Sequence, residues 1–223
     1  MDSIPTNDAS RLSARLIDLF SGARQADSVD PACGQRMSQE EYLARERASE
    51  TKHEYVNGEM IAMAGAPPRH NLVAANITGA LHQRLRARPC VVLQSDQRVR
   101  VSATGLYTYP DVTVVCGRPE LHAQDPMTIL NPLVIFEVLS DSTEAYDRGA
   151  KFAHYRHLPS LAEYILVSPT ERRVEHYKRL EAGHWLLTEC EGPASALALP
   201  VLEVEITLAE IFEKLDLLES SRT

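Results

Sequence analysis

Apolar and polar residues recur along this chain with two periods, one typical of helices and one typical of strands. The first elements that these patterns predict begin near residue 38. Ser38 is followed three residues later by Glu41, which is the spacing of a capping box and predicts a short helix over 38–47. The segment HEYVNGEMIAMAG, residues 53–65, alternates apolar and polar positions around Asn57-Gly58. Because this dipeptide favours tight hairpin turns, we expect two antiparallel strands there.

The patterns that follow predict one helix and three strands. Apolar side chains recur at a roughly helical period over residues 70–87, and Pro89 ends that pattern. Three segments rich in β-branched residues then predict strands over 90–102, 109–117 and 132–140. Their continuous apolar character is typical of central strands covered on both faces, whereas residues 118–130 are more polar.

The last part of the pattern predicts two helices around a group of strands. Residues 142–157 carry a broad apolar face, and residues 207–218 have apolar positions at helical spacing. An antiparallel meander is predicted from the segments 162–169, 173–180 and 184–190. The whole pattern predicts an α/β or α+β fold: a central mixed sheet flanked by helices, with an N-terminal hairpin and a C-terminal meander.

Composition separates the beginning of the chain from the rest. Asp, Ser and Ala are frequent in residues 1–36, and we interpret this segment as a tail that carries one short helix. The folded domain is predicted over residues 37–218. Met37 is a candidate start of translation, and an intact mass of the native protein that begins at Met1 would refute this hypothesis.

Length and composition bound the class of protein. At 223 residues with 44% hydrophobic side chains, the chain has the size of one enzyme-like domain with a sizeable core. No apolar run is long enough for a membrane-spanning helix and no signal peptide is apparent, so we expect a cytoplasmic protein. Reduced thiols are predicted for the four cysteines, which are widely spaced: Cys33, Cys90, Cys116 and Cys190.

The formal net charge of −8 argues against a protein that coats nucleic acid non-specifically, because such binding draws its affinity from clustered basic residues. Any contact with DNA must therefore be local. The basic groups available for it are Arg84, Arg86, Arg88, Arg98, Arg100, Arg172 and Arg173. For each of them the alternative is an ordinary solvated face.

Two carboxylates occupy unusual positions in the predicted strands. Asp111 opens one strand directly after Pro110, and Glu137 lies inside the next apolar strand. Burial of an ionised carboxylate is costly unless a cation compensates it, so a metal ion or a basic side chain is expected nearby. If the strands are neighbours, the two acids form a hard-oxygen site suited to Mg²⁺. The alternative is that Asp111 caps a turn and Glu137 pairs with an arginine.

Six ordered blocks of the sequence resemble a known family. The blocks are MSQEEYL, HEYVNGEMIAMAG, HNLVAANI, YPDVTVVC, FEVLSDSTEAYDRGAKFAHY and AEYILV. They resemble the bacterial putative restriction endonuclease family, formerly a domain of unknown function, within the PD-(D/E)XK nuclease superfamily. The resemblance runs from about Met37 to the C-terminal helix and leaves only the tail uncovered.

The resemblance implies a restriction-endonuclease-like fold with a site for Mg²⁺ or Mn²⁺ in a cleft. It implies that Asp111 and Glu137 are metal ligands and that the backbone carbonyl of Val138 supplies a third oxygen. Glu54 matches a further acid of the family, which binds metal or orients a ligand. The alternative for Glu54 is a strand-edge carboxylate that faces solvent.

The chain departs from the superfamily pattern at one position. The lysine expected two residues after the acidic position is replaced by Leu139. Lys151 matches the D-x-x-x-K segment of the family, and we expect it to reach back into the cleft and to position water or an oxyanion. The alternative for Lys151 is an ordinary helix pair with Asp147, four residues earlier.

Other polar residues near the matching blocks are candidates to line the same cleft: His53, His70, Asn76 and Gln94. A structural role, such as a bond to the backbone, is the simpler explanation for each of them alone. We interpret Asp141 as the N-cap of the helix that follows it.

The expected function is that of a divalent-metal-dependent endonuclease that hydrolyses phosphodiester bonds, with DNA as the favoured substrate. Two alternatives stay open: a module that binds nucleic acid without turnover, and a self-associating protein whose acids form structural ion pairs. A homodimer would suit the nuclease, because two related sites cut the two strands of a duplex most simply.

Overall fold

The computed structural model describes residues 36–218, so the predicted tail lies outside the described residues except for Arg36. Its α-helices are α2 (Gln39–Ala48), α3 (Pro68–Leu85), α4 (Glu144–Tyr146), α5 (Phe152–Tyr155) and α6 (Leu208–Ile211). Shorter turns are a π-helical turn η2 (Asp147–Lys151) and the 3₁₀ turns η3 (Glu181–Gly183) and η4 (Leu215–Leu218). Within the described range, no helix combines the length and the apolar character needed to cross a membrane.

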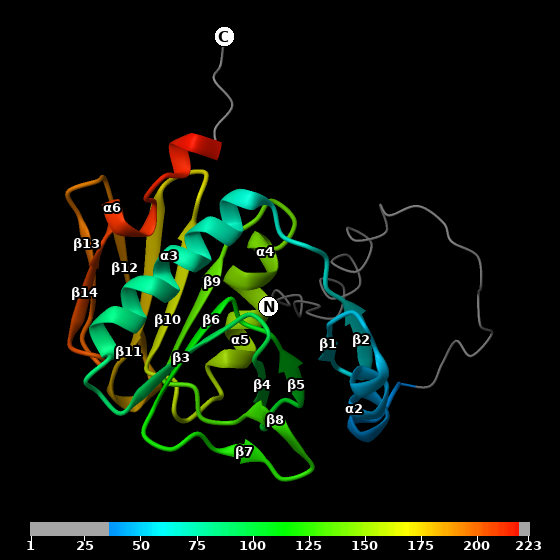
Figure 1. The fold of residues 1–223 in the computed structure, drawn as a ribbon. Coiled ribbons are helices and arrows are strands. Elements are labelled where there is room, and N and C mark those ends of the chain that lie inside the picture. Colours follow the sequence, from blue (N-terminus) through cyan, green and yellow to red (C-terminus); the bar gives the residue numbers. More distant parts are fainter. Residues whose placement is uncertain (1–35, 219–223) are drawn as a thin grey trace, which may run out of the picture. The chain divides into compact units, whose positions relative to one another are not determined.

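A six-stranded mixed sheet, here called the main sheet, carries most of the apolar segments (Figure 1). From edge to edge its strands are β12 (Trp185–Glu191), β11 (Arg173–Arg179), β10 (Glu163–Ser168), β9 (Val134–Val138), β6 (Val112–Cys116) and β3 (Cys90–Gln94). Strands β9 and β10 are parallel, and the other neighbours are antiparallel. The predicted mixed sheet with its C-terminal meander β10–β11–β12 is confirmed.

A second sheet, which the sequence did not predict, brings together segments that are distant along the chain. Its six strands in order are β2 (Glu59–Ala62), β1 (His53–Val56), β5 (Leu106–Thr108), β4 (Arg98–Val101), β8 (Asp125–Ile129) and β7 (Leu121–His122). The N-terminal hairpin β1–β2 joins this sheet through a pair between Tyr55 and Tyr107. A separate two-stranded ribbon consists of β13 (Ala196–Leu199) and β14 (Val204–Thr207).

Local signals form the N-terminal elements as predicted. The capping box at α2 is complete, since Ser38 and Glu41 exchange bonds of 2.8 and 3.2 Å between side chain and backbone. The hairpin turns at Asn57 and Gly58, whose φ angles of 52° and 90° lie in the left-handed region that this dipeptide adopts readily. Glycine is also required there by space, because an added Cβ would lie 2.5 Å from Cβ of Arg36.

The strand predicted over 90–102 is wrong as one unit. It breaks at a turn closed by the Gln97 N–H to the Gln94 carbonyl at 2.9 Å, and β3 and β4 belong to different sheets. The polar stretch 118–130 is also not a simple loop, since it forms β7 and β8. Its buried Asp125 is compensated by Arg98 at 2.5 Å, so polar residues can occupy this strand.

The helix predicted over 142–157 is present in three consecutive segments, α4, η2 and α5. The π-helical turn η2 places Asp147 and Lys151 in the interior. The predicted N-cap Asp141 is wrong, because the helix begins after Thr143, which makes no side-chain capping bond. The preceding turn is closed instead by the backbone of Ser140, whose carbonyl accepts from the Thr143 N–H at 3.1 Å.

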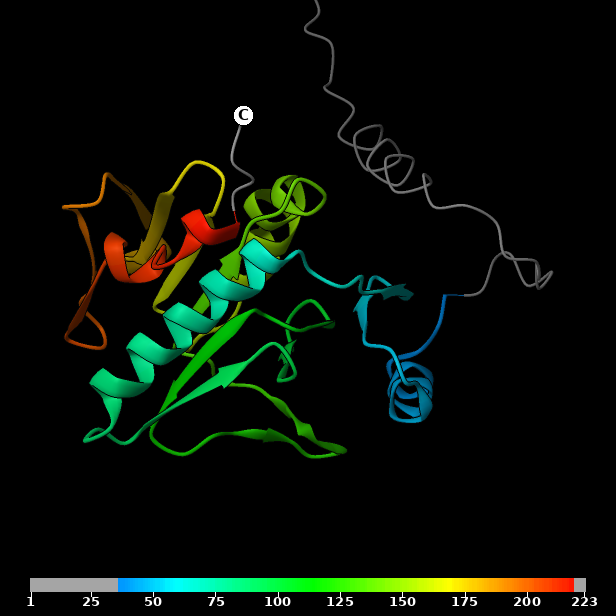
Figure 2. The same ribbon diagram turned by 45° about the horizontal axis from the view of Figure 1, so that its top comes forward.

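Apolar clusters cover both faces of the main sheet. On one face α3 packs against alternate residues of β6 and β9, among them Phe136 and Val138. On the other face Tyr155 of α5 packs against Ile135 and Leu139. Since side chains alternate along a strand, Glu137 must project to the same face as Ile135 and Leu139, where it contacts Lys151 of η2 and Tyr155 of α5. The ribbons of α4 and α5 are drawn in Figures 1 and 2.

The prediction of reduced thiols is wrong for two cysteines. Cys90 and Cys116 are direct partners in the antiparallel pair β3–β6 and form a disulfide. Their separation of 26 residues hides this proximity in the sequence, because register alone makes them neighbours. Cys190 is a free thiol.

Candidate active site

Asp111 and Glu137 lie at the adjoining ends of two neighbouring strands. Val112 of β6 pairs with Phe136 of β9, so the antiparallel register sets Asp111 beside Glu137. The Val138 N–H donates a hydrogen bond of 2.7 Å to Oδ2 of Asp111, which fixes this carboxylate across the strand end. The structure therefore brings together two acids that are far apart in the sequence.

Lys151 connects Glu137 to two other carboxylates. Its Nζ lies 2.9 Å from Oε1 of Glu137, 3.4 Å from Oε1 of Glu54 and 3.5 Å from Oδ1 of Asp147. All four side chains are buried. The expected reach of Lys151 into the cluster and its alternative, the helix pair with Asp147, are thus both present in one ion network.

Glu54 does not face solvent, so the alternative considered for it is wrong. It lies in β1 of the second sheet and accepts a short hydrogen bond from the hydroxyl of Thr108 in the adjacent strand β5. Lys151 contacts the same Glu54 oxygen. Because Lys151 also contacts Glu137 of the main sheet, the lysine links acids from the two sheets.

Burial and like charge shift the pKa values of this cluster. Burial raises the pKa of Glu137 well above its ordinary value; Lys151 opposes that rise, and Asp147 and Asp111 add to it. Burial likewise raises the pKa of Asp147. Burial alone would lower the pKa of Lys151, but Glu137 and Glu54 hold it well above its usual value, so this lysine stays charged.

Sequence reasoning missed Tyr155 as a partner of Glu137 on the helix that carries Lys151. The hydroxyl of Tyr155 donates to Oε1 of Glu137 at 2.8 Å, and Asp147 lies at the other end of the same face. The spacing 147, 151 and 155 is a four-residue helical repeat, which was the available signal. The sequence alone does not show that this face of the helix covers Glu137, so the role of these residues at the site could not be predicted.

Of the residues considered for the cleft, His70 comes nearest to the acids. It lies in the first turn of α3, and its Nε2 is 3.2 Å from Oδ2 of Asp111. Burial opposes protonation of His70, but the bond to Asp111 raises its pKa overall. His70 Nδ1 is buried and has no hydrogen-bond partner among the described residues.

The other candidates have different positions. His53 Nδ1 lies 2.9 Å from Glu46, and Asn76 donates to the backbone carbonyls of Ile211 and Glu213 at 3.1 and 3.0 Å, so both have structural partners. Gln94 ends the edge strand β3 and is exposed.

Leu139 packs in the apolar cluster around Tyr155, which explains why no lysine stands at this position. It projects to the same face as Glu137, but the second sheet and α5 cover it with apolar side chains such as Val99. The cation of this site therefore comes from the helix.

The donor chemistry at the two strand ends fits a hard divalent cation with few protein ligands. Within residues 36–218, no three His, Cys, Asp or Glu side chains are grouped so as to hold a metal ion. Among the described contacts, those of Asp111 use Oδ2 and those of Glu137 use Oε1, which leaves Oδ1 and Oε2 for other ligands. Mg²⁺ commonly binds through one or two carboxylates and retains several waters.

A mixed sheet covered by helices, with acids at two adjoining strand ends and a lysine from the following helix, defines a restriction-endonuclease-like α+β protein. The fold is similar to a crystal structure described as a putative nuclease belonging to DUF820 from Anabaena variabilis ATCC 29413. The TM-score is 0.67 with 16% sequence identity, over 80% of this chain and 99% of that chain.

Sequence relatives agree with this class. Residues 39–210 match the family model Uma2, described as Putative restriction endonuclease. The uncharacterized protein sll1609 of Synechocystis sp. (strain ATCC 27184 / PCC 6803 / Kazusa) is 35% identical over 164 residues, which are 74% of this chain and 93% of that protein. The protein slr1290 of the same strain is 37% identical over 152 residues, 68% of this chain and 79% of that protein. The chain belongs to the Uma2 putative restriction endonuclease family, as its sequence blocks predicted.

Proposed function

We propose that this protein is a Mg²⁺- or Mn²⁺-dependent endonuclease that hydrolyses phosphodiester bonds in DNA. The observation that carries the proposal is the contact of Lys151 with both Glu137 and Glu54 beside Asp111, in a chain of a restriction endonuclease family. Acids that can hold a divalent metal and a lysine that can stabilise developing negative charge suit the hydrolysis of a phosphodiester.

Each residue has a proposed role. Asp111 and Glu137 would hold the metal through their available oxygens, together with the backbone carbonyl of Val138. A divalent metal at this position would supply positive charge to the phosphoryl group and lower the pKa of water. Lys151 keeps its charge inside the cluster and stabilises the negative charge that gathers on the phosphoryl oxygens in the transition state. Glu54 orients Lys151 through their contact of 3.4 Å.

Hydrolysis then needs a water oxygen that bonds to phosphorus while the bond from phosphorus to the leaving deoxyribose oxygen breaks. The attacking water gives one proton to solvent water, and the leaving oxygen takes up a proton from solvent. The excess of carboxylates over cations at this site favours a bound divalent cation for the same electrostatic reason, because each added positive charge relieves repulsion among the acids.

A homodimer and a cytoplasmic location complete the proposal. Two copies related by a two-fold axis would present two sites to the two strands of a duplex. A second candidate function is a module that binds nucleic acid without cutting it. The observation that favours it is Leu139, which is buried in the core where the superfamily has its lysine.

Digestion of plasmid DNA tests the proposal directly. The purified protein is incubated with supercoiled plasmid and Mg²⁺ or Mn²⁺, beside Asp111→Ala and Glu137→Ala. We expect nicked or linear DNA with the wild type and a loss of about 100-fold or more with either variant. Undiminished cutting by both variants would exclude the proposed site.

A further inference from the structure

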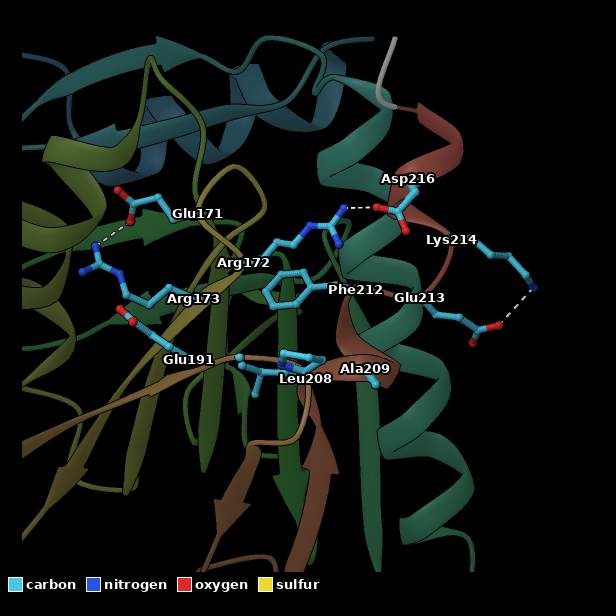
Figure 3. A pocket seen from close by; sticks show the side chains of 12 residues that line it. Glu171, Arg172, Arg173, Glu191, Leu208, Ala209, Phe212, Glu213, Lys214 and Asp216 are labelled. Carbon is cyan, nitrogen blue, oxygen red and sulfur yellow. Dashed lines mark hydrogen bonds and ion pairs between the residues drawn. The ribbon is translucent and has the colours of Figure 1, made fainter. Parts of the chain in front are cut away.

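Two large cavities lie outside the acidic cluster, and the first is not suited to a charged ligand. It has a volume of about 730 Å³ beside α6 and the turn between β10 and β11 (Figure 3). Its charges are paired with each other: Arg173 with Glu171 at 2.6 Å, Lys214 with Glu213 at 3.3 Å, and Arg172 with Asp216. A charged ligand would have to displace these pairs.

The second cavity is an open groove of about 910 Å³ between α3 and β3. None of the described residues that line it is acidic, although the chain as a whole has a net charge of −8. Its polar lining consists of Arg86, His82, Gln83, Thr78 and Gln94, and the remainder is apolar or glycine: Ala75, Gly79, Val92 and Leu93. This groove therefore combines positive charge with neutral donors, which is the lining that suits an anionic ligand.

One end of the groove lies close to Asp111 of the candidate active site. Gln94 pairs with Val112, the residue that directly follows Asp111. Helix α3 begins at the same place, because His70 in its first turn contacts Asp111. From there α3 runs beside β3 (Figure 2), and Ala75 to Arg86 span about 16 Å of helix.

We propose that this groove binds the sugar–phosphate backbone of a nucleic-acid strand and leads it to the acidic cluster. The proposal rests on the proposed nuclease function, and it names the surface that holds the substrate. A span of about 16 Å is long enough to contact more than one consecutive phosphate of a strand. Arg86 contributes a charge contact, while the side-chain amides of Gln83 and Gln94 donate hydrogen bonds that do not depend on base sequence.

Gly79 supplies a way to close the groove without disturbing the fold. It lies on the groove side of α3, and a Cβ added there meets no atom within 4 Å. A tryptophan at this position would occupy the groove, whereas an alanine would add only one methyl group. Gly79→Trp and Gly79→Ala are therefore a matched pair that differ in the volume they place in the groove.

The test measures binding to a fluorescein-labelled oligonucleotide, single-stranded and as a duplex, by anisotropy in EDTA so that no cleavage occurs. Arg86→Ala is compared with Arg45→Ala, an exposed arginine on α2 with the same change of charge. We expect Arg86→Ala to weaken binding by about tenfold and to reduce the slope against salt by about one. Gly79→Trp should also weaken binding, while Gly79→Ala and Arg45→Ala bind as the wild type does.

The proposal that this groove binds nucleic acid would be refuted if Arg86→Ala and Gly79→Trp both bound the oligonucleotides with wild-type affinity. It would also be refuted if the wild type bound neither probe. The plasmid assay with the same proteins separates this proposal from the proposed function. Undiminished cutting by Gly79→Trp contradicts the groove and leaves the nuclease intact. Groove-dependent binding without any cutting supports the groove and contradicts the nuclease.

Discussion

Nζ of Lys151, on the helix that covers the main sheet, lies 2.9 Å from Oε1 of Glu137 in β9. The site thus obtains its cation from a helix, because the strand position that carries lysine in the superfamily is the core residue Leu139. The same lysine contacts Glu54, so one charged group contacts carboxylates from both sheets.

Glu137→Gln should leave the free energy of unfolding in EDTA at pH 8 unchanged or slightly higher. Burial raises the pKa of Glu137 well above its ordinary value, so the fold disfavours its ionised form. Lys151 keeps Glu54 and Asp147 as partners in this variant. Urea unfolding measures the change, and a loss of about 3–5 kcal/mol would instead indicate a structural ion pair.

Lys151→Met should destabilise the protein by about 3–5 kcal/mol in the same buffer, because it leaves several buried carboxylates without their cation. Cutting should be lost as well. Lys214→Met is the control, since Lys214 is exposed and contacts only Glu213 among the described ion pairs. Equal stability of the two variants would show that Lys151 does not neutralise the cluster.

The contribution of Asp147 to metal-free stability should fall as the pH rises above about 4. Burial raises the pKa of Asp147 above its ordinary 3.8, so the folded state binds more protons than the unfolded state between the two values. The contribution is therefore favourable at low pH and lost as the pH rises. Asp147→Asn should flatten the profile measured by urea unfolding, and an unchanged slope would contradict this.

Reduction should destabilise the protein through the bond between Cys90 and Cys116. The bond closes a loop of 26 residues and connects the edge strand β3 to β6, so its loss should cost about 3–4 kcal/mol. Thermal unfolding with and without reductant measures this loss of stability. Cys190→Ser is the control, and reduction should destabilise it as much as it destabilises the wild type. Peptide mapping that finds Cys90 and Cys116 as free thiols under non-reducing conditions would refute the bond.

Local signals predicted the elements whose form depends on neighbouring residues. The capping box at Ser38 and Glu41 and the turn at Asn57-Gly58 formed where expected, because each is decided within a few residues. The periodic pattern of α3 and the continuous apolar run of β9 were also sufficient. Glu137 lies in β9 and Asp111 directly precedes β6, which was also predicted as a strand, so the central pair of the candidate site could be anticipated.

Long-range register could not be predicted. The pattern of 90–102 continues across its turn, so nothing local reveals that β3 and β4 enter different sheets. Burial of Asp125 depends on Arg98, which is distant in sequence, and the pair Cys90–Cys116 depends on the alignment of β3 with β6. For the same reason the contact between Glu54 and Lys151 could not be predicted, because it depends on the position of the second sheet relative to the main sheet.

The most direct test of the account is the rate of plasmid cleavage in Mg²⁺ by the wild type and by Glu137→Gln, each first shown to be folded by its urea transition. The account predicts metal-dependent cutting by the wild type, none in EDTA, and a rate lower by about 100-fold or more in Glu137→Gln. Equal rates for the two proteins, or cutting that persists in EDTA, would contradict it.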